Sequence, residues 1–236
     1  RQATVVGMAK GAGMIRPDMA TMLAFLATDA AMPGDLLDRI LREAVADTFN
    51  AISIDGDTST NDACVLCAAG TLDAPAVTEG TAAAEALAAA VRAVCDELAT
   101  AIVRDGEGAS KLVTVEVVEA ASRAEARAVA DAIAHSPLVK TALFASDPNW
   151  GRILAAVGRA SVPGLDIEQV RIWLDDCLIV SGGGRDAGYT EAAGRAVMAR
   201  DAFRIRVALG RGEAAARLLT CDLSYDYVRI NAEYRT

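Results

Sequence analysis

Strand-like and helix-like segments follow one another irregularly along this chain, and their order constrains the fold more than any other feature. The segments do not form the strict strand–helix–strand repeat of a doubly wound parallel sheet. The order therefore predicts an α+β fold of packed helix and sheet layers, as one large domain or two subdomains. Strands are expected at residues 4–8, 22–28, 64–69, 112–118, 170–174, 178–180, 203–209 and 225–231, and helices at 35–49, 82–103, 122–135, 150–159 and 190–200.

Composition excludes several classes of protein. The net charge is −9, so the basic surface that nucleic acid requires is not expected, whereas a small charged metabolite is compatible with it. The most apolar long stretch, residues 82–103, carries four charges, which argues against a membrane span. The five cysteines form no disulfide framework and no signal peptide is visible, so we expect reduced thiols and a cytoplasmic protein. The chain begins at Arg1 without an initiator Met, so we expect a further N-terminal portion.

Three familiar motifs are weak here. Cys64 and Cys67 have the spacing of a redox or zinc pair, but they have no second pair and no nearby His, so core cysteines without a metal are expected. His135 is the only histidine and is expected to end a helix rather than serve a catalytic triad. The glycines at 182–184 lack a following Lys-Ser/Thr and are expected to form a turn rather than a phosphate loop.

A threonine with its own base offers a different route to catalysis. The α-amine of an N-terminal threonine has an ordinary pKa of about 7.7–8.0, so part of it is neutral near pH 7 and can accept the hydroxyl proton. This chemistry requires cleavage of the preceding peptide bond. Thr21 follows the small residue Ala20 and precedes an apolar run, which is compatible with cleavage there. The local sequence alone equally allows Thr21 simply to begin a strand.

A set of motifs running from end to end resembles the ornithine acetyltransferase (glutamate N-acetyltransferase) family, in the family's order. Each motif is weak alone, and together they are highly specific. They lie at Gly7–Met14 (GMAKGAGM), Ala20–Leu23 (ATML), Thr28–Ala30 (TDA), Asp55–Asp62 (DGDTSTND), Asp105–Ala109 (DGEGA), Leu138–Ala142 (LVKTA), Asp147–Ile153 (DPNWGRI), Cys221–Tyr227 (CDLSYDY) and Ile230–Thr236 (INAEYRT).

The resemblance implies a layered fold of the kind shared with self-processing aminopeptidases that use an N-terminal nucleophile. It implies autoproteolysis between Ala20 and Thr21, so that residues 1–20 end an N-terminal (alpha) chain and residues 21–236 form the C-terminal (beta) chain. The two chains stay associated, and two of each form a heterotetramer. The implied reaction is acetyl transfer from N-acetylornithine to glutamate in arginine biosynthesis, without a cofactor. Some members also accept acetyl-CoA as acetyl donor, which leaves that activity open here.

The same resemblance assigns functional positions. It implies that Thr21 is the catalytic nucleophile and contacts the substrate, together with Lys10, Glu107, Asn231 and Thr236. Lys10 is expected to meet a substrate carboxylate, Glu107 to receive the ornithine ammonium, and Asn231 to offer a donor and an acceptor from a strand end. The oxyanion-hole donors and one further threonine are implied to lie in the N-terminal chain. Without the resemblance, Lys10 and Glu107 would be solvated loop residues.

Two other functions remain open on the sequence. An amidohydrolase or aminopeptidase of the same self-processing fold would use Thr21 in the same way but pass the acyl group to water. A non-catalytic binding or assembly domain would show neither cleavage nor an acetyl adduct. The acidic, hydroxyl-rich run at residues 55–62 either lines the site or packs through its own Asx and Ser/Thr turns.

Overall fold

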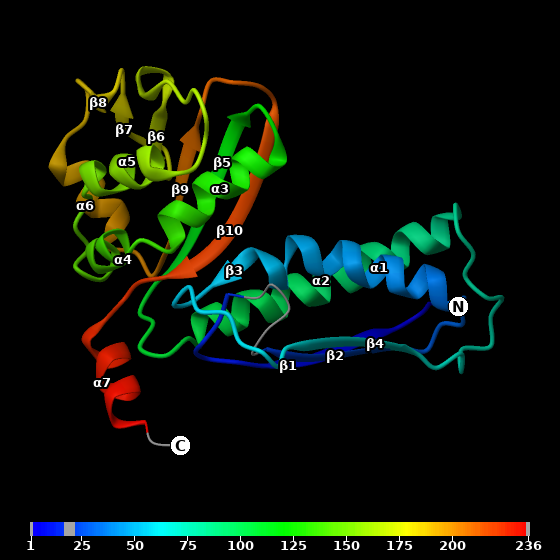
Figure 1. The fold of residues 1–236 in the computed structure, drawn as a ribbon. Helices are drawn as coiled ribbons and strands as arrows, with labels where there is room; N and C mark the ends of the chain where they lie inside the picture. The colour runs from blue at the N-terminus through cyan, green and yellow to red at the C-terminus, as the bar shows by residue number, and fades with distance from the viewer. Residues whose placement is uncertain (1, 17–21, 235–236) are drawn as a thin grey trace. The chain divides into compact units, whose positions relative to one another are not determined.

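The computed structural model describes residues 2–16 and 22–234, and Figure 1 shows the chain as a ribbon. The chain divides into two compact units. The first comprises residues 1–52 and 57–105, and the second comprises residues 53–56 and 106–236. Each unit combines helices with a sheet, so the expected α+β layered fold is confirmed. Whether residues 1–20 and 21–236 become separate chains stays a prediction.

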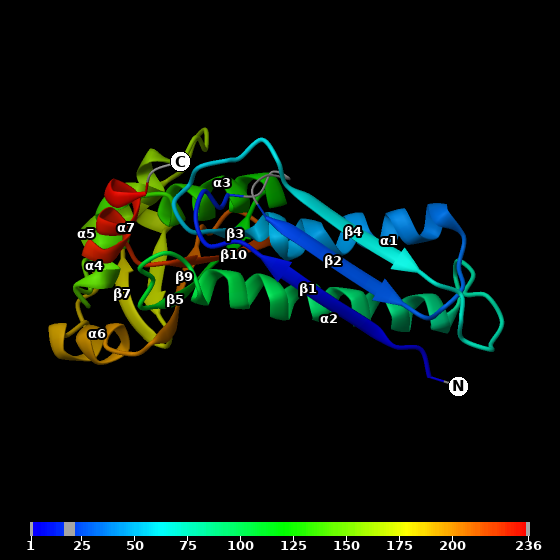
Figure 2. The same cartoon turned by 90° about the horizontal axis from the view of Figure 1, so that it is seen from below.

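The first unit contains a three-stranded sheet with the order β1-β2-β4, formed by β1 (Val5–Lys10), β2 (Leu23–Thr28) and β4 (Ala63–Ala68). β1 runs antiparallel to β2, which runs parallel to β4. The helices α1 (Gly34–Asp47) and α2 (Ala82–Arg104) pack on one face of the sheet, and the 3₁₀ turn η1 (Phe49–Ala51) follows α1 (Figure 2). A Cβ on Gly7 would lie 2.8 Å from Val94 Cγ1, so this glycine lets β1 approach α2 closely.

The other face of this sheet carries exposed apolar side chains. In register, Met8 lies opposite Phe25, and Phe25 lies opposite Val65, so the three side chains form one row across the sheet. They are 70%, 51% and 40% exposed, and Val6 in the neighbouring row is 58% exposed. We call the surface formed by Val6, Met8, Phe25 and Val65 the open sheet face. Among the described residues, helices pack on the opposite face, which holds the buried Ala24, Leu26 and Leu66.

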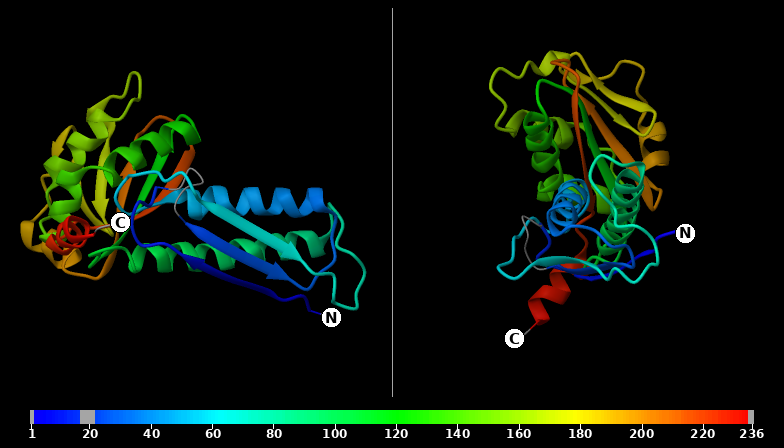
Figure 3. Two further views of the ribbon diagram at one scale, coloured as in Figure 1. Left: turned by 60° about the horizontal axis from the view of Figure 1, so that its bottom comes forward. Right: turned by 90° about the vertical axis from the view of Figure 1, so that its right-hand side faces the viewer.

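The second unit is built on a seven-stranded mixed sheet with the order β3-β10-β5-β9-β6-β7-β8. α3 packs on β5 and β10, α5 on β7 and β8, and α6 on β6 and β7, around a continuous apolar core (Figure 3). The bounds are β3 (Ile52–Ser53), β5 (Leu112–Ala120), α3 (Arg123–Ala134), α4 (Pro137–Phe144), α5 (Trp150–Arg159), η2 (Ile167–Gln169), β6 (Arg171–Leu174), β7 (Cys177–Ser181), β8 (Gly184–Arg185), α6 (Glu191–Met198), β9 (Ala202–Ala208), β10 (Ala214–Cys221) and α7 (Tyr225–Glu233).

The strand predicted at residues 225–231 is wrong, because these residues form the helix α7. The hydroxyl of Ser224 caps this helix by accepting a hydrogen bond from the Tyr227 backbone N–H at 3.3 Å, and Asp226 lies in the first turn, where a negative charge is favoured. None of the residues of α7 is buried, and Figure 1 shows the helix in red beyond the end of β10.

Among the described residues, no helix combines the length and the apolar character that a membrane span requires.

Candidate active site

Two residues assigned to substrate binding, Glu107 and Asn231, meet in the second unit. They lie 124 positions apart in the sequence, and Asn231 Nδ2 donates a hydrogen bond to Glu107 Oε2 at 2.9 Å. Glu107 lies in the loop that leads toward β5, and Asn231 lies in the second turn of α7. The structure thus brings together two of the expected site residues.

The side-chain amide of Asn231 is oriented by a second contact. Its Nδ2 also donates to the backbone oxygen of Tyr227, one helical turn earlier, at 3.0 Å. Both amide hydrogens are therefore engaged, and the atom left to face a ligand is Oδ1, a hydrogen-bond acceptor. The pair presents the Glu107 carboxylate and the Asn231 carbonyl together, which suits an ammonium group. The strand end expected at Asn231 is wrong, because Asn231 lies in the helix α7, and its role in binding a ligand stays a prediction.

Asp222 anchors the loop that carries Glu107. This buried carboxylate accepts hydrogen bonds from the Ser110 backbone N–H at 2.8 Å, the Ser110 hydroxyl at 2.6 Å and the Lys111 backbone N–H at 2.9 Å. Hydrogen bonds to a charged acceptor contribute about 1.5–3 kcal/mol each. Since Asp222 directly follows β10, these bonds tie residues 110–111 to the point where the chain turns toward α7.

The same loop packs tightly against the start of α7. The Ser224 hydroxyl donates to the backbone oxygen of Gly108 at 2.6 Å. Gly108 has a φ of +66°, and a Cβ there would lie 2.4 Å from the Tyr227 backbone nitrogen. Only glycine satisfies both the left-handed backbone and this approach. The Gly-Glu-Gly sequence therefore positions Glu107 against α7 for a steric reason that the sequence pattern alone does not reveal.

A buried lysine supports the same corner of the second unit and was not identified from the sequence as a functional residue. Lys140 on α4 is 3% exposed, and its Nζ donates to Thr220 Oγ1 at 3.0 Å and to the backbone oxygen of Cys221. Burial lowers the pKa of Lys140, while nearby acidic groups, Asp222 and Asp55 among them, partly offset the effect. Lys140 thus fixes the end of β10, directly before the Asp222 anchor.

In the first unit, Lys10 ends β1 at the edge of the sheet. Lys10 lies opposite Leu23, and Leu23 follows Thr21 by two positions in the sequence. The Lys10 side chain is exposed. A cavity of about 560 Å³ adjoins it, lined by residues 9–12 of the β1 end and by Leu98, Ala101, Ile102 and Asp105. An exposed ammonium beside a cavity is suited to a substrate carboxylate.

The remaining predicted site residues, Ala20, Thr21 and Thr236, lie outside the described residues. Lys10 belongs to the first unit and the Glu107–Asn231 pair to the second, so the geometry of each is given within its own unit.

Asp62 is an enclosed acid that the sequence analysis included only in the acidic run at residues 55–62. Both of its carboxylate oxygens are shielded from solvent, and neither accepts a hydrogen bond of normal geometry from the described residues. Burial raises the pKa of Asp62 to about 6, and a weaker interaction with the Met22 backbone offsets part of that rise. Elsewhere in the run, the Asn61 backbone N–H donates to Ser59 Oγ at 3.3 Å, so local turns are present too.

The expectation that Cys64 and Cys67 are core cysteines is wrong, because Cys64 is half-buried and Cys67 is exposed. They lie on one strand at a spacing that points them to opposite faces of the sheet, and only one face of that sheet is covered by helices among the described residues. His135 caps the C-terminus of α3, and Gly182 and Gly183, both with positive φ, make the turn between β7 and β8. Among the described residues, no group of three or more His, Cys, Asp or Glu side chains is arranged to hold a metal ion. The expectation of no cofactor stays a prediction.

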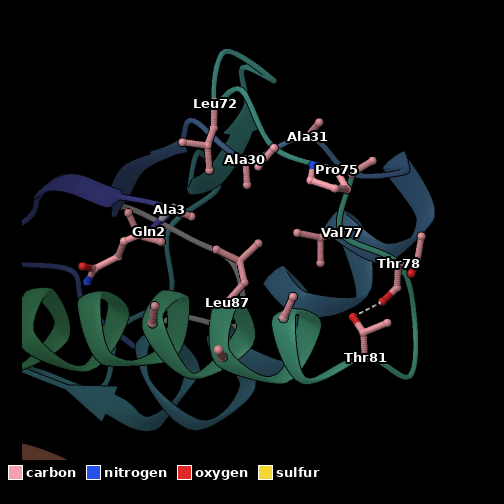
Figure 4. A pocket seen from close by; sticks show the side chains of 16 residues that line it. Gln2, Ala3, Ala30, Ala31, Leu72, Pro75, Val77, Thr78, Thr81 and Leu87 are labelled. Atoms are coloured by element: carbon pink, nitrogen blue, oxygen red, sulfur yellow. Dashed lines mark hydrogen bonds between the residues drawn. The ribbon is translucent and has the colours of Figure 1, made fainter.

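A mainly apolar cavity lies elsewhere in the first unit. It has a volume of about 650 Å³, and Figure 4 shows Leu72, Pro75, Val77 and Leu87 around it. The Thr81 hydroxyl donates to the Thr78 backbone oxygen at 2.7 Å at its rim. None of the predicted site residues lines this cavity, and its lining carries no titratable side chain.

Comparison with known proteins identifies close relatives over the whole chain. Residues 1–236 match the family model described as the ArgJ family. The chain is 63% identical over 236 residues to the arginine biosynthesis bifunctional protein ArgJ of Methylococcus capsulatus, and 56% identical over 234 residues to the protein of that name from Pseudomonas syringae pv. tomato. These matches cover 100% and 99% of this chain but 58% of each relative, so the chain spans less than two thirds of their length.

A solved structure shares the fold. The crystal structure of the arginine biosynthesis bifunctional protein argJ from Bacillus halodurans, at 2.00 Å resolution, superposes with a TM-score of 0.85 at 39% sequence identity. The match covers 91% of this chain and 100% of that one.

Proposed function

Because this chain belongs to the ArgJ family, we propose that it forms the larger part of a glutamate N-acetyltransferase that moves the acetyl group of N-acetylornithine to glutamate. The structural observation that best supports this is the hydrogen bond between Glu107 and Asn231. It joins two distant residues into one acceptor site for an ammonium group, which the side chain of N-acetylornithine carries.

Autoproteolysis would come first. The hydroxyl oxygen of Thr21 attacks the carbonyl carbon of Ala20, the bond from that carbon to the Thr21 nitrogen breaks, and the hydroxyl proton passes to the nitrogen. Water then hydrolyses the resulting ester, which releases the Ala20 carboxylate and restores the hydroxyl. Thr21 now carries a free amine, which is the base that its hydroxyl lacked before cleavage.

Acetyl transfer would follow in two steps. The Thr21 oxygen attacks the acetyl carbonyl of N-acetylornithine, its amine takes the hydroxyl proton and gives it to the departing ornithine nitrogen, and an acetyl ester remains on Thr21. The neutral amine of glutamate attacks the ester carbonyl and the bond from that carbon to the Thr21 oxygen breaks. One proton of the attacking amine passes through the Thr21 amine to that oxygen, which yields N-acetylglutamate and free Thr21. Each oxyanion requires preorganised donors, worth about 2.7–4 kcal/mol apiece. In this proposal the donors belong to the N-terminal chain.

Residues of this chain would bind and orient the substrates. Glu107 and the Asn231 carbonyl hold the side-chain ammonium group of N-acetylornithine, since both are hydrogen-bond acceptors and the two residues are bonded to each other. Lys10 holds a carboxylate, and Thr236 adds a contact on the basis of family resemblance. We propose no cofactor, and acetyl-CoA as a second acetyl donor in keeping with the bifunctional name of the relatives.

The partner of this chain would be the N-terminal portion of the same protein, and two copies of each chain would form the heterotetramer. The relatives are longer than this chain, and the open sheet face offers apolar surface that a second layer of structure could cover. The proposed location is the cytoplasm.

The test is the intact mass of the purified full-length protein before and after incubation with N-acetylornithine. We expect two chains separated between Ala20 and Thr21, and a transient gain of one acetyl group on the chain that begins with Thr21. Thr21→Ala should abolish both cleavage and transfer, because the hydroxyl and the future amine belong to one residue. Full transferase activity in that variant would overturn the assignment.

The rival is an amidohydrolase of the same fold, which would pass the acetyl group to water. Acetylglutamate formation and acetate release, measured in one reaction mixture, separate the two activities. Acetate as the main product would favour the hydrolase.

A further inference from the structure

The acidic, hydroxyl-rich run at residues 55–62 reaches the candidate site through its first member. The Tyr227 hydroxyl on α7 donates a hydrogen bond to Asp55 Oδ2 at 3.3 Å, across 172 positions of sequence. Both side chains are half-buried, so water competes only partly for this bond. Asp55 and Tyr227 belong to the same compact unit as Glu107 and Asn231, so all four can be considered together.

The backbone before Asp55 is held at the end of β10. The short strand β3 is the neighbour of β10 in the sheet and ends two residues before Asp55. The thiol of Cys221, the last residue of β10, contacts the backbone oxygen of Ile54 at 3.8 Å as a weak donor, and both residues are buried. Asp55 thus follows a buried edge of the sheet, so its carboxylate can serve as a fixed point for the tyrosine.

Tyr227 in turn lies at the centre of the contacts that shape the ammonium site. Its backbone oxygen accepts the hydrogen bond that orients the Asn231 amide, at 3.0 Å. Its backbone nitrogen would lie 2.4 Å from a Cβ on Gly108, the residue after Glu107. Because Tyr227 and Asn231 are four positions apart, they lie on the same face of α7. Holding the Tyr227 side chain therefore holds the turn on which both binding residues depend.

The helix α7 has little else to fix its orientation. None of its nine residues is buried, so the burial of apolar side chains contributes little. At its first residue, the Tyr225 ring meets Phe144 edge to face, with the centroids 5.5 Å apart. The direction of the helix after that point depends on polar contacts, and the bond from Tyr227 to Asp55 is one that reaches a buried part of the sheet.

We propose that Tyr227, held by Asp55, is a positioning residue for the ammonium site formed by Glu107 and Asn231. The inference rests on the proposed function, because that function assigns the side-chain ammonium of N-acetylornithine to this site. Neither Tyr227 nor Asp55 contacts the substrate. They act through the turn of α7 that orients the Asn231 amide, which gives the acidic run a role at the site that its sequence left open.

The test is Tyr227→Phe in the full-length protein after self-cleavage. The change removes the hydroxyl and keeps the ring. The kcat/KM for N-acetylornithine should fall about fivefold or more through a higher KM, because the ammonium site loses its orientation. The kcat/KM for glutamate should stay within about twofold of the wild-type value, because glutamate has no side-chain ammonium. A general loosening of the structure would lower both values.

A double-mutant cycle tests whether the hydrogen bond itself is responsible. Asp55→Ala should cause the same fall as Tyr227→Phe, and the double variant should fall no further, because either change alone breaks the bond. Asp55→Asn keeps an acceptor oxygen for the hydroxyl, so its kcat/KM for N-acetylornithine should stay within about twofold of wild type. The matched control is Tyr225→Phe, which removes a hydroxyl from a residue of α7 that is 83% exposed and should change neither value.

Three results would each overturn the inference. They are a wild-type kcat/KM for N-acetylornithine in Tyr227→Phe, an equal fall for both substrates, and additive effects in the double variant. A fall in Asp55→Asn as large as that in Asp55→Ala would do the same, since it would show that the charge matters and the bond does not. All four results leave the proposed function intact, because the wild type still transfers acetyl. Failure of the wild type to transfer acetyl would instead refute the proposed function.

Discussion

At the scale of single residues, the structure gives Asn231 a defined polarity. Its two amide hydrogens are held by Glu107 and by the Tyr227 backbone, so its carbonyl oxygen is the atom available to substrate. No sequence pattern fixes the orientation of a side-chain amide, because the orientation depends on partners 124 and four positions away. The family resemblance supplied the residue, and the structure supplied its chemistry.

Asn231→Ala tests this role. Removing the side chain takes one acceptor from the ammonium site and releases Glu107 from its partner, so acetyl transfer should fall at least about tenfold, equivalent to roughly 1.4 kcal/mol of transition-state stabilisation. Self-cleavage should remain intact, and the melting temperature should change by only a few degrees, because Asn231 is exposed.

The matched control is Glu233→Ala. Glu233 is also an exposed residue of α7, and because it follows Asn231 by two positions, it lies on the opposite side of the helix. It should leave transfer unchanged. If Asn231→Ala had wild-type kinetics, Asn231 would leave the site, and its bond to Glu107 would be purely structural.

At the scale of elements, the sequence predicted most helices and strands because their apolar periodicity is strong. It missed β10, which begins Ala-Ala-Ala, a run with little strand propensity. Pairing with β5 on one side and β3 on the other decides its conformation. It also missed α4, which starts at a proline shortly after the helix predicted at residues 122–135, and a proline usually ends a helix. Pro137 in fact begins one, after the Ser136 cap, where a missing N–H costs nothing.

Local propensity also failed to predict the helix α7, because tertiary contacts decide its conformation. Tyr225, Tyr227 and Val228 look strand-like in isolation, but the capping hydroxyl of Ser224 and the neighbouring loop at Gly108 start a helix there. The connection between the Glu107 loop and α7 could not be predicted, since Asp222 and Ser224 act on residues more than a hundred positions away.

Asp222→Ala tests whether this connection positions Glu107. Loss of the carboxylate leaves the Ser110 and Lys111 N–H groups without their partner, so the loop should loosen. Because the loop carries a binding residue, KM for N-acetylornithine should rise about tenfold or more, and the melting temperature should fall by several degrees.

Asp226→Ala serves as the control. Asp226 lies in the first turn of α7 and forms an exposed ion pair with Arg229 at 2.9 Å, which contributes little to stability. Its KM should stay near the wild-type value. A KM for Asp222→Ala equal to that of this control would show that Glu107 is held in place without the anchor.

At the scale of the whole molecule, one face of the three-stranded sheet in the first unit is left uncovered by the described helices. Met8, Phe25 and Val65 form an exposed apolar row across all three strands, and Val6 extends it. Exposed apolar patches of this kind are typical of surfaces that another polypeptide covers. We expect the 236-residue chain expressed alone to be inactive and to aggregate, and coexpression with the N-terminal portion to recover it in a stable complex.

A charged substitution on the open sheet face separates this explanation from general instability. Phe25→Glu places a carboxylate in the centre of the row, on a side chain that is 51% exposed, so it should improve the solubility of the chain expressed alone. The same charge would be buried in the complex, where desolvation is costly, so copurification with the N-terminal portion should fall at least about tenfold. The control is Val228→Glu, which also replaces an exposed apolar side chain with an acid, at a position of α7 that is 61% exposed. It should change neither the solubility nor the copurification. A soluble wild-type chain, or a Phe25→Glu complex of normal yield, would mean that the open sheet face is not the surface on which the two chains associate.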